Sequence, residues 1–129
     1  MEKVFVYGSL MTGFGNHRLL SSGSAMGSVI SYGADRLVWP GQMLSLGAFP
    51  GLIRKDQLSL INGEVYEVNE EVFERLDMLE GYPSFYDREV RKTKNGHEAW
   101  VYFLNPLDYK YYSEEVVIEN GDWRAFACR

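Results

Sequence analysis

Two groups of residues in this chain have the types and positions needed to act on a small ligand. The first is Tyr7, Gly8, Ser9 and Leu10, which follow a short apolar stretch and precede a glycine-rich segment. Gly8 has no β-carbon to obstruct a ligand, and we expect it to adopt a positive φ that a β-branched residue would tolerate poorly. Successive exposed amides bind anions, so this turn would suit a carboxylate or a developing oxyanion. The alternative is an ordinary turn between a strand and a loop.

A helix predicted over residues 70–80 carries the second group. Asn69 is a suitable N-cap, acidic residues fill the first turn, and Gly81 and Pro83 end the helix. We expect the apolar residues along one face to pack on the core, and these are Val72, Phe73, Leu76 and Leu79.

Glu80 lies on that apolar face. At about 100° per residue, it is roughly 20° from Phe73 and roughly 40° from Leu76 around the helix axis. A buried carboxylate must be ion-paired, hydrogen-bonded or held in a pocket with a raised pKa. In a pocket, Glu80 would be a candidate general acid and base. The alternative is a carboxylate in a frayed last turn that faces solvent.

Composition narrows the classes of function. The 129 residues are 46% hydrophobic, which predicts one compact domain over residues 1–129. The net charge of −5 argues against a nucleic-acid partner. No apolar run approaches the length of a membrane span, and no signal-peptide pattern opens the chain. The single Cys128 cannot form an internal disulfide, which favours a reducing compartment. Together these features predict a cytoplasmic protein without a membrane partner.

The sequence predicts neither a metal site nor a bound cofactor. His17 and His97 have no Cys or acidic neighbours at the spacing of metal ligands. The glycines near the N-terminus lack both the P-loop pattern and the G-x-G-x-x-G spacing of dinucleotide sites. Arg88, two residues after Tyr86, is expected to brace the structure beside the Glu80 turn.

The pattern of apolar and turn-forming residues predicts more strands than helices. The Asn95-Gly96 pair predicts a hairpin with a type I′ turn, and residues 16–22 predict a short helix. We predict an α+β fold, in which a small, mixed, barrel-like sheet packs against one principal helix and short flanking helices. The expected strands are 3–7, 25–32, 35–39, 42–46, 64–68, 86–93 and 98–104, with breaks at Gly33 and at Pro40-Gly41.

Motifs spread over most of the chain resemble the γ-glutamylcyclotransferase superfamily, in particular its AIG2-like and γ-glutamylamine cyclotransferase branch. Each motif is weakly specific, whereas their number and order are strongly specific. They are the opening strand with residues 7–10, Gly-x-x-Pro-Gly at 47–51, Gly-Glu-Val-Tyr at 63–66, Leu-Asp-x-x-Glu-Gly-Tyr-Pro at 76–83, Tyr-x-Arg at 86–88 and Gly-Asp-Trp at 121–123.

The resemblance implies that a γ-glutamyl compound is converted to 5-oxoproline with release of an amine or amino acid, without a cofactor. It implies that Glu80 is the acid/base and that Tyr7, Gly8, Ser9 and Leu10 line the substrate pocket. Three kinds of small-molecule substrate stay open: γ-glutamyl-ε-lysine, a γ-glutamyl amino acid, or another γ-glutamyl amine. The alternative function is a non-catalytic binding or interaction protein of the same fold, which would have no need of an acid at position 80.

Overall fold

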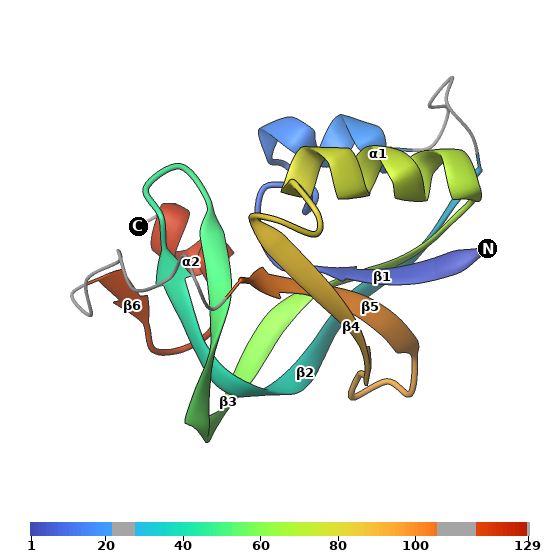
Figure 1. The fold of residues 1–129 in the computed structure, drawn as a ribbon. Coiled ribbons are helices and arrows are strands. Elements are labelled where there is room, and N and C mark those ends of the chain that lie inside the picture. The colour runs from blue at the N-terminus through green and yellow to red at the C-terminus, as the bar shows by residue number, and fades with distance from the viewer. Residues whose placement is uncertain (22–27, 106–115, 129) are drawn as a thin grey trace.

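The computed structural model describes residues 1–21, 28–105 and 116–128, and its six strands form one sheet (Figure 1). The strand order is β4-β5-β1-β3-β2-β6; β1 and β5 run parallel, and the other neighbouring pairs are antiparallel. The sheet is mixed and strongly curled, so the predicted α+β class and barrel-like sheet are confirmed. The strands are β1 (Glu2–Val6), β2 (Val29–Ser45), β3 (Pro50–Val68), β4 (Tyr86–Lys92), β5 (Glu98–Leu104) and β6 (Val117–Ile118).

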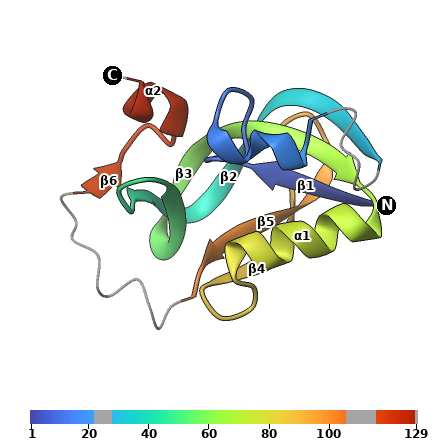
Figure 2. The same ribbon diagram turned by 90° about the horizontal axis from the view of Figure 1, so that it is seen from above.

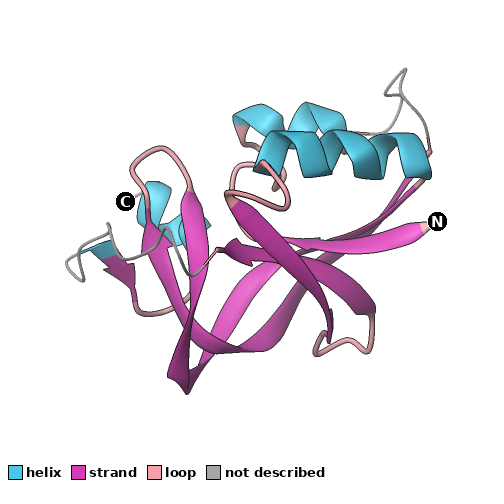
Figure 3. Ribbon diagram, viewed as in Figure 1, coloured by secondary structure: helices cyan, strands magenta, loops and turns pink. Residues whose placement is uncertain are grey.

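The helices gather at two places on the sheet (Figure 3). Helix α1 (Glu70–Glu80) and the 3-10 helix η1 (Gly15–Leu19) lie together on one side of β1, and α2 (Trp123–Ala127) lies near β6 (Figure 2). The helix expected over 16–22 is therefore the shorter 3-10 turn η1, and residue 22 lies outside the described residues. No helix in the described ranges is long and apolar enough to cross a membrane.

Strands β2 and β3 form one long two-stranded ribbon, whereas the sequence pattern predicted several shorter strands in this region. The expected breaks at Gly33 and at Pro40-Gly41 are shifts in register between β2 and β3, not strand ends. At Gly33 one extra residue lies in β2, and at Pro40-Gly41 the extra residues 55–57 lie in β3. Pairing resumes beyond each irregularity, so the local breaking signal does not end the strand. Residues 50–63 were not predicted as strand, because they form β3 mainly as the partner of β2. Of the expected strand 25–32, residues 25–27 lie outside the described part of the chain.

Helix α1 follows its sequence signals closely. The Asn69 side chain accepts a hydrogen bond of 3.1 Å from the Val72 N–H, and Gly81 ends the helix in the left-handed conformation with φ +66°. Leu76 is fully buried and Phe73 is half-buried, as predicted. The expectation that Leu79 packs in the core is wrong, because Leu79 is 43% exposed in the last turn, where the helix overhangs a cavity.

Replacing Leu76 with Ala should cost about 2–5 kcal/mol of the free energy of unfolding, because a fully buried leucine leaves a cavity. Met78→Ala on the same helix is the matched control, since Met78 is 75% exposed and its loss should cost less than about 0.5 kcal/mol. Urea unfolding of both variants measures the difference. Equal losses would show that α1 is not anchored through Leu76.

The β4–β5 hairpin forms as predicted, but its turn is of another type. The Thr93 N–H donates to the His97 carbonyl at 2.8 Å, and the Gly96 N–H donates to the Thr93 carbonyl at 3.0 Å. Gly96 has φ +91°, whereas no described non-glycine residue has a positive φ. A type I′ turn needs a positive φ at both central residues, so the prediction of type I′ at Asn95-Gly96 is wrong.

Candidate active site

All five residues singled out from the sequence line one cavity of about 210 Å³. Helix α1 runs along β1 in the same direction, so the last turn of the helix lies over the end of the strand (Figure 1). Glu80 reaches the cavity from the helix, and residues 7–10 border it from the turn that follows β1. The remaining lining residues are Phe5, Val6, Asn16, Phe49, Pro50, Leu79, Phe85, Tyr86 and Tyr102.

The Glu80 carboxyl group stands without a polar partner in the part of the chain that the structure describes. Among the described residues, none makes a hydrogen bond or an ion pair with it. Burial in the cavity wall raises the pKa of Glu80 to about 7, because the charged form loses hydration without compensation. Near neutral pH the group is therefore present in both protonated and ionised forms, as a residue that both accepts and delivers a proton requires.

The turn formed by residues 7–10 is held through its carbonyl groups. The Met11 N–H donates to the Gly8 carbonyl at 3.0 Å, and the Asn16 N–H donates to the Ser9 carbonyl at 3.1 Å. The Asn16 side chain also donates to the Ser9 hydroxyl at 2.9 Å. In the described structure, the amide N–H groups of Ser9 and Leu10 donate to no protein acceptor. These two donors are thus available to an anionic group of a ligand.

Gly8 is needed for a different reason from the one expected. Its φ is not among the positive values, so the prediction of a left-handed conformation is wrong. A β-carbon at this position would instead lie 2.7 Å from Pro50 Cδ and 2.8 Å from Pro50 Cγ. The turn after β1 packs so closely against the start of β3 that only glycine fits.

Three tyrosines form much of the cavity wall. The Tyr7 hydroxyl donates to the Tyr102 carbonyl at 2.8 Å, and the Tyr86 hydroxyl donates to the Pro50 carbonyl at 2.7 Å. Burial raises the pKa of Tyr7 well above its usual value, so this phenol stays protonated and remains a donor. Sequence reasoning did not select Tyr86 or Tyr102 as cavity residues. Only the Tyr-x-Arg motif pointed to Tyr86, and nothing local marked Tyr102.

Arg88 braces the structure behind Glu80, as expected. Its guanidinium group binds the Asp77 carboxylate through two hydrogen bonds of 3.0 and 3.2 Å, and lies over the ring of Trp100 with its centre 4.3 Å from the ring centroid. The same Asp77 accepts a 2.7 Å hydrogen bond from the Tyr102 hydroxyl. The last turns of α1 are thus fixed to both β4 and β5, which sets the position of Glu80.

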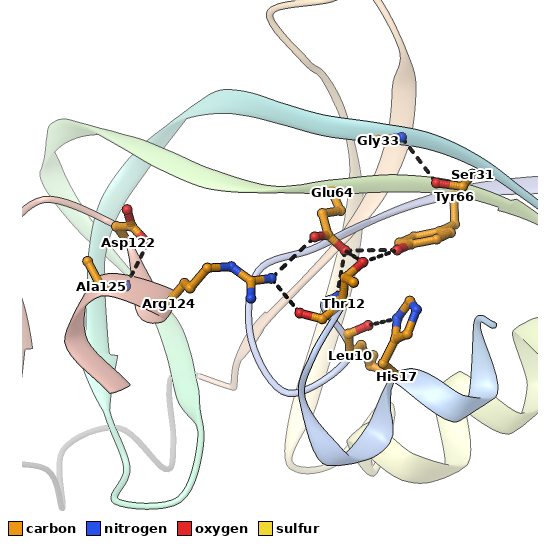
Figure 4. Close-up of polar contacts among 10 residues, drawn as sticks. All are labelled: Leu10, Thr12, His17, Ser31, Gly33, Glu64, Tyr66, Asp122, Arg124 and Ala125. Atoms are coloured by element: carbon orange, nitrogen blue, oxygen red, sulfur yellow. Dashed lines mark hydrogen bonds and ion pairs between the residues drawn. The ribbon is translucent and has the colours of Figure 1, made fainter. Parts of the chain in front are cut away.

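Glu64 anchors the far side of the turn after β1 (Figure 4). Its Oε1 atom accepts hydrogen bonds from the Thr12 N–H at 2.9 Å and from the Tyr66 hydroxyl at 2.8 Å. Arg124 of α2 donates to the Thr12 carbonyl at 2.6 Å, and its Nη2 atom lies 3.4 Å from Glu64 Oε2. Three distant parts of the chain therefore meet at Thr12, two residues beyond Leu10. The sequence showed Glu64 only as part of a motif, without indicating this role.

The described residues contain no cluster of three or more His, Cys, Asp or Glu side chains that could hold a metal ion. The His17 Nδ1 atom lies 2.9 Å from the Leu10 carbonyl oxygen. Since a carbonyl can only accept, this nitrogen carries the proton, and His17 supports the turn.

Comparison with known proteins identifies the family. The family described as gamma-glutamyl cyclotransferase, AIG2-like, matches residues 4–125. The chain belongs to this family. The resemblance inferred from the motifs is confirmed, and the family assignment supports γ-glutamylcyclotransferase activity.

Two relatives and one solved structure illustrate the relationship of this AIG2-like chain to its family. A protein of Methanocaldococcus jannaschii, which bears γ-glutamylcyclotransferase as a provisional name, is 33% identical over 98% of both chains. The γ-L-glutamyl-butirosin B γ-glutamyl cyclotransferase of Niallia circulans is 34% identical, with 84% of this chain and 70% of that protein covered. The mouse AIG2-like protein shares the fold, with a TM-score of 0.77 and 23% identity over 95% of this chain and 88% of that chain.

Proposed function

We propose that this protein cyclises a γ-glutamyl amide to 5-oxoproline and releases an amine, with Glu80 as the single acid/base. One observation carries the proposal: a carboxyl group with a pKa of about 7 and no polar partner among the described residues lines the same small cavity as Ser9 and Leu10, whose amides have no acceptor in the described structure. The site thus combines a proton carrier with donors for negative charge, which are the two parts that this reaction needs.

The reaction is intramolecular. The α-amine of the glutamyl group attacks its own γ-carbonyl carbon, and the new C–N bond closes a five-membered ring. Ionised Glu80 takes a proton from the amine, and the carbonyl oxygen becomes negative. When the original amide C–N bond breaks, protonated Glu80 delivers that proton to the departing nitrogen, so no net proton is consumed.

The protein has to hold the substrate curled, with the amine close to the carbonyl carbon. Restricting the substrate in this way removes much of the entropic barrier to ring closure. The amides of Ser9 and Leu10 are offered either to the developing oxyanion or to the α-carboxylate of the glutamyl group. The tyrosine hydroxyls are committed to backbone carbonyls or to Asp77, so they shape the cavity.

A non-catalytic binding protein of the same fold is the alternative. The raised pKa of Glu80 favours catalysis. Desolvating a carboxylate destabilises the protein, and a site that only binds its ligand gains nothing from a carboxylate in this state. The test is 5-oxoproline release from γ-glutamyl-ε-lysine, γ-glutamyl amino acids and γ-glutamyl alkylamides by the purified protein. We expect product and free amine in equal amounts from at least one compound. Binding of these compounds without any product would support the alternative.

The pH dependence of kcat/KM should follow the ionisation of the Glu80 carboxyl group. Its pKa is raised, so the base is ionised only above about pH 7 and becomes protonated as the pH falls. We expect kcat/KM to level off above about pH 7 and to fall about tenfold per pH unit below it. Initial rates across this range, with enzyme stability checked at each pH, measure the profile. A profile without an inflection near neutral pH would contradict the assignment of Glu80 as the base.

A further inference from the structure

Arg124 of α2 is not part of the described lining of the cavity, yet it contacts the segment that follows residues 7–10 (Figure 4). Its Nη2 atom donates to the Thr12 carbonyl at 2.6 Å and lies 3.4 Å from Glu64 Oε2. Hydrogen bonds from a guanidinium group are charge-assisted and are stronger than those between neutral groups. We call Thr12, Glu64 and Arg124 together the Thr12 anchor.

Helix α2 is fixed to β3 without the help of the Arg124 side chain. The Asn62 N–H, two residues before Glu64 on β3, donates to the Gly121 carbonyl at 2.9 Å. Trp123, the first residue of α2, is buried. These contacts place residue 124 beside Glu64, so truncation of the Arg124 side chain should leave α2 in position.

The Glu64 carboxylate depends on Arg124 for its counter-charge. The Glu64 side chain is only 14% exposed, and Arg124 is its one ion-pair partner among the described residues. Glu64 Oε1 accepts hydrogen bonds from the Thr12 N–H at 2.9 Å and from the Thr12 hydroxyl at 3.1 Å. Without Arg124, a largely buried carboxylate would lack a cation, and its movement toward water would draw Thr12 with it.

Thr12 is close enough in the chain to control the amides that face the ligand. Met11 alone separates it from Leu10, and Met11 is buried with its N–H donating to the Gly8 carbonyl at 3.0 Å. Residues 8–12 thus form one short, tightly connected segment, which the Thr12 anchor holds at its far end. A displacement of Thr12 therefore changes the direction of the Ser9 and Leu10 amides.

Resting on the proposed function, we propose that Arg124 is a positioning residue for the reaction. Through the Thr12 anchor it holds the Ser9 and Leu10 amides in the orientation that receives negative charge on the substrate. Arg124 touches neither the substrate nor Glu80 and acts only through Thr12. The helix α2, near the C-terminal end of the described chain, thereby belongs to the machinery of the site.

Kinetics of Arg124 variants test the proposal, with whichever γ-glutamyl compound the wild type converts fastest. Arg124→Ala should lower kcat/KM for 5-oxoproline release on the order of tenfold, since a displacement of about 1 Å can cost about 10²-fold. Arg124→Lys should recover most of this loss, because a single nitrogen makes both contacts and an ammonium group can donate to the same two oxygens. Arg75→Ala is the matched control, since Arg75 is exposed on α1 and lies outside the cavity lining.

Two further measurements separate positioning from a general loss of structure. The inflection of the pH profile near pH 7 should stay in place in Arg124→Ala, because the surroundings of Glu80 are unchanged. Glu64→Gln and the double variant Glu64→Gln/Arg124→Ala complete a double-mutant cycle. Since both residues act on Thr12, the double variant should be about as slow as the slower single variant.

The outcomes separate this inference from the function beneath it. If the wild type releases no 5-oxoproline from any compound, the proposed function fails and the inference fails with it. If the wild type is active and folded Arg124→Ala keeps the wild-type kcat/KM, the cyclotransferase stands and the positioning role is wrong. A shifted inflection, or losses that multiply in the double variant, would also overturn it. Arg124→Gln, polar but uncharged, replaces the alanine variant in these comparisons if circular dichroism shows that Arg124→Ala is unfolded.

Discussion

Glu80→Gln should remain folded and should lose most of its 5-oxoproline formation. Glutamine keeps the shape of the side chain and its hydrogen-bonding capacity, but it cannot take a proton from the substrate amine or return it to the leaving nitrogen. Removal of a positioned acid/base typically lowers the rate by about 10²–10⁴-fold. Because the contacts that we propose between residues 7–10 and the substrate are retained, binding of a γ-glutamyl ligand should persist. Product formation and ligand binding, measured separately, distinguish the loss of chemistry from the loss of affinity.

The same substitution should also stabilise the protein at neutral and alkaline pH. Because the folded-state pKa of Glu80 is raised, ionisation of Glu80 favours unfolding, and stability is lost as the pH rises toward about 7. Glutamine has no charge to desolvate, so the variant avoids this loss. Glu74→Gln on the exposed side of α1 is the matched control and should change neither turnover nor its pH dependence. Near-wild-type rates in Glu80→Gln would show that another group transfers the proton.

Gly8→Val should reduce kcat/KM on the order of 10²-fold, even though the position is only a turn between β1 and η1. The new β-carbon would lie 2.7 Å from Pro50, so either the turn or the start of β3 must shift. Both border the cavity, and a displacement of about 1 Å between the turn and Glu80 is enough for a loss of this size. Steady-state kinetics together with circular dichroism would separate a local displacement from unfolding.

Gly15→Val is the control for this change. Gly15 belongs to the same N-terminal segment, yet a β-carbon there would meet no atom within 4 Å. We expect Gly15→Val to keep nearly the full rate, although it introduces the same side chain. If Gly8→Val is folded and equally active, the close approach of Gly8 to Pro50 has no bearing on the site.

Local sequence signals predicted the elements that hold the site. The Asn69 cap, the apolar spacing and Gly81 predicted the helix Glu70–Glu80 correctly, because capping and periodicity depend on residues only a few positions apart. The same reasoning predicted the hairpin β4–β5 but not its turn, since several loop types accept the Asn95-Gly96 pair. It failed at residues 50–63, where pairing with β2 and not local composition makes the strand.

By itself, the sequence determined the family, the α+β class and which five residues border the candidate site. The order of the motifs and the positions of residues around a helix follow directly from the amino-acid sequence. Only the tertiary structure decided the surroundings of those residues. The raised pKa of Glu80 depends on what surrounds its carboxyl group, and the need for glycine at position 8 comes from Pro50, far along the chain. The anchoring of Thr12 by Glu64 and the exposure of Leu79 at the cavity mouth likewise arise from contacts between distant segments. Such contacts have no local signature, because burial and charge environment are properties of the assembled fold.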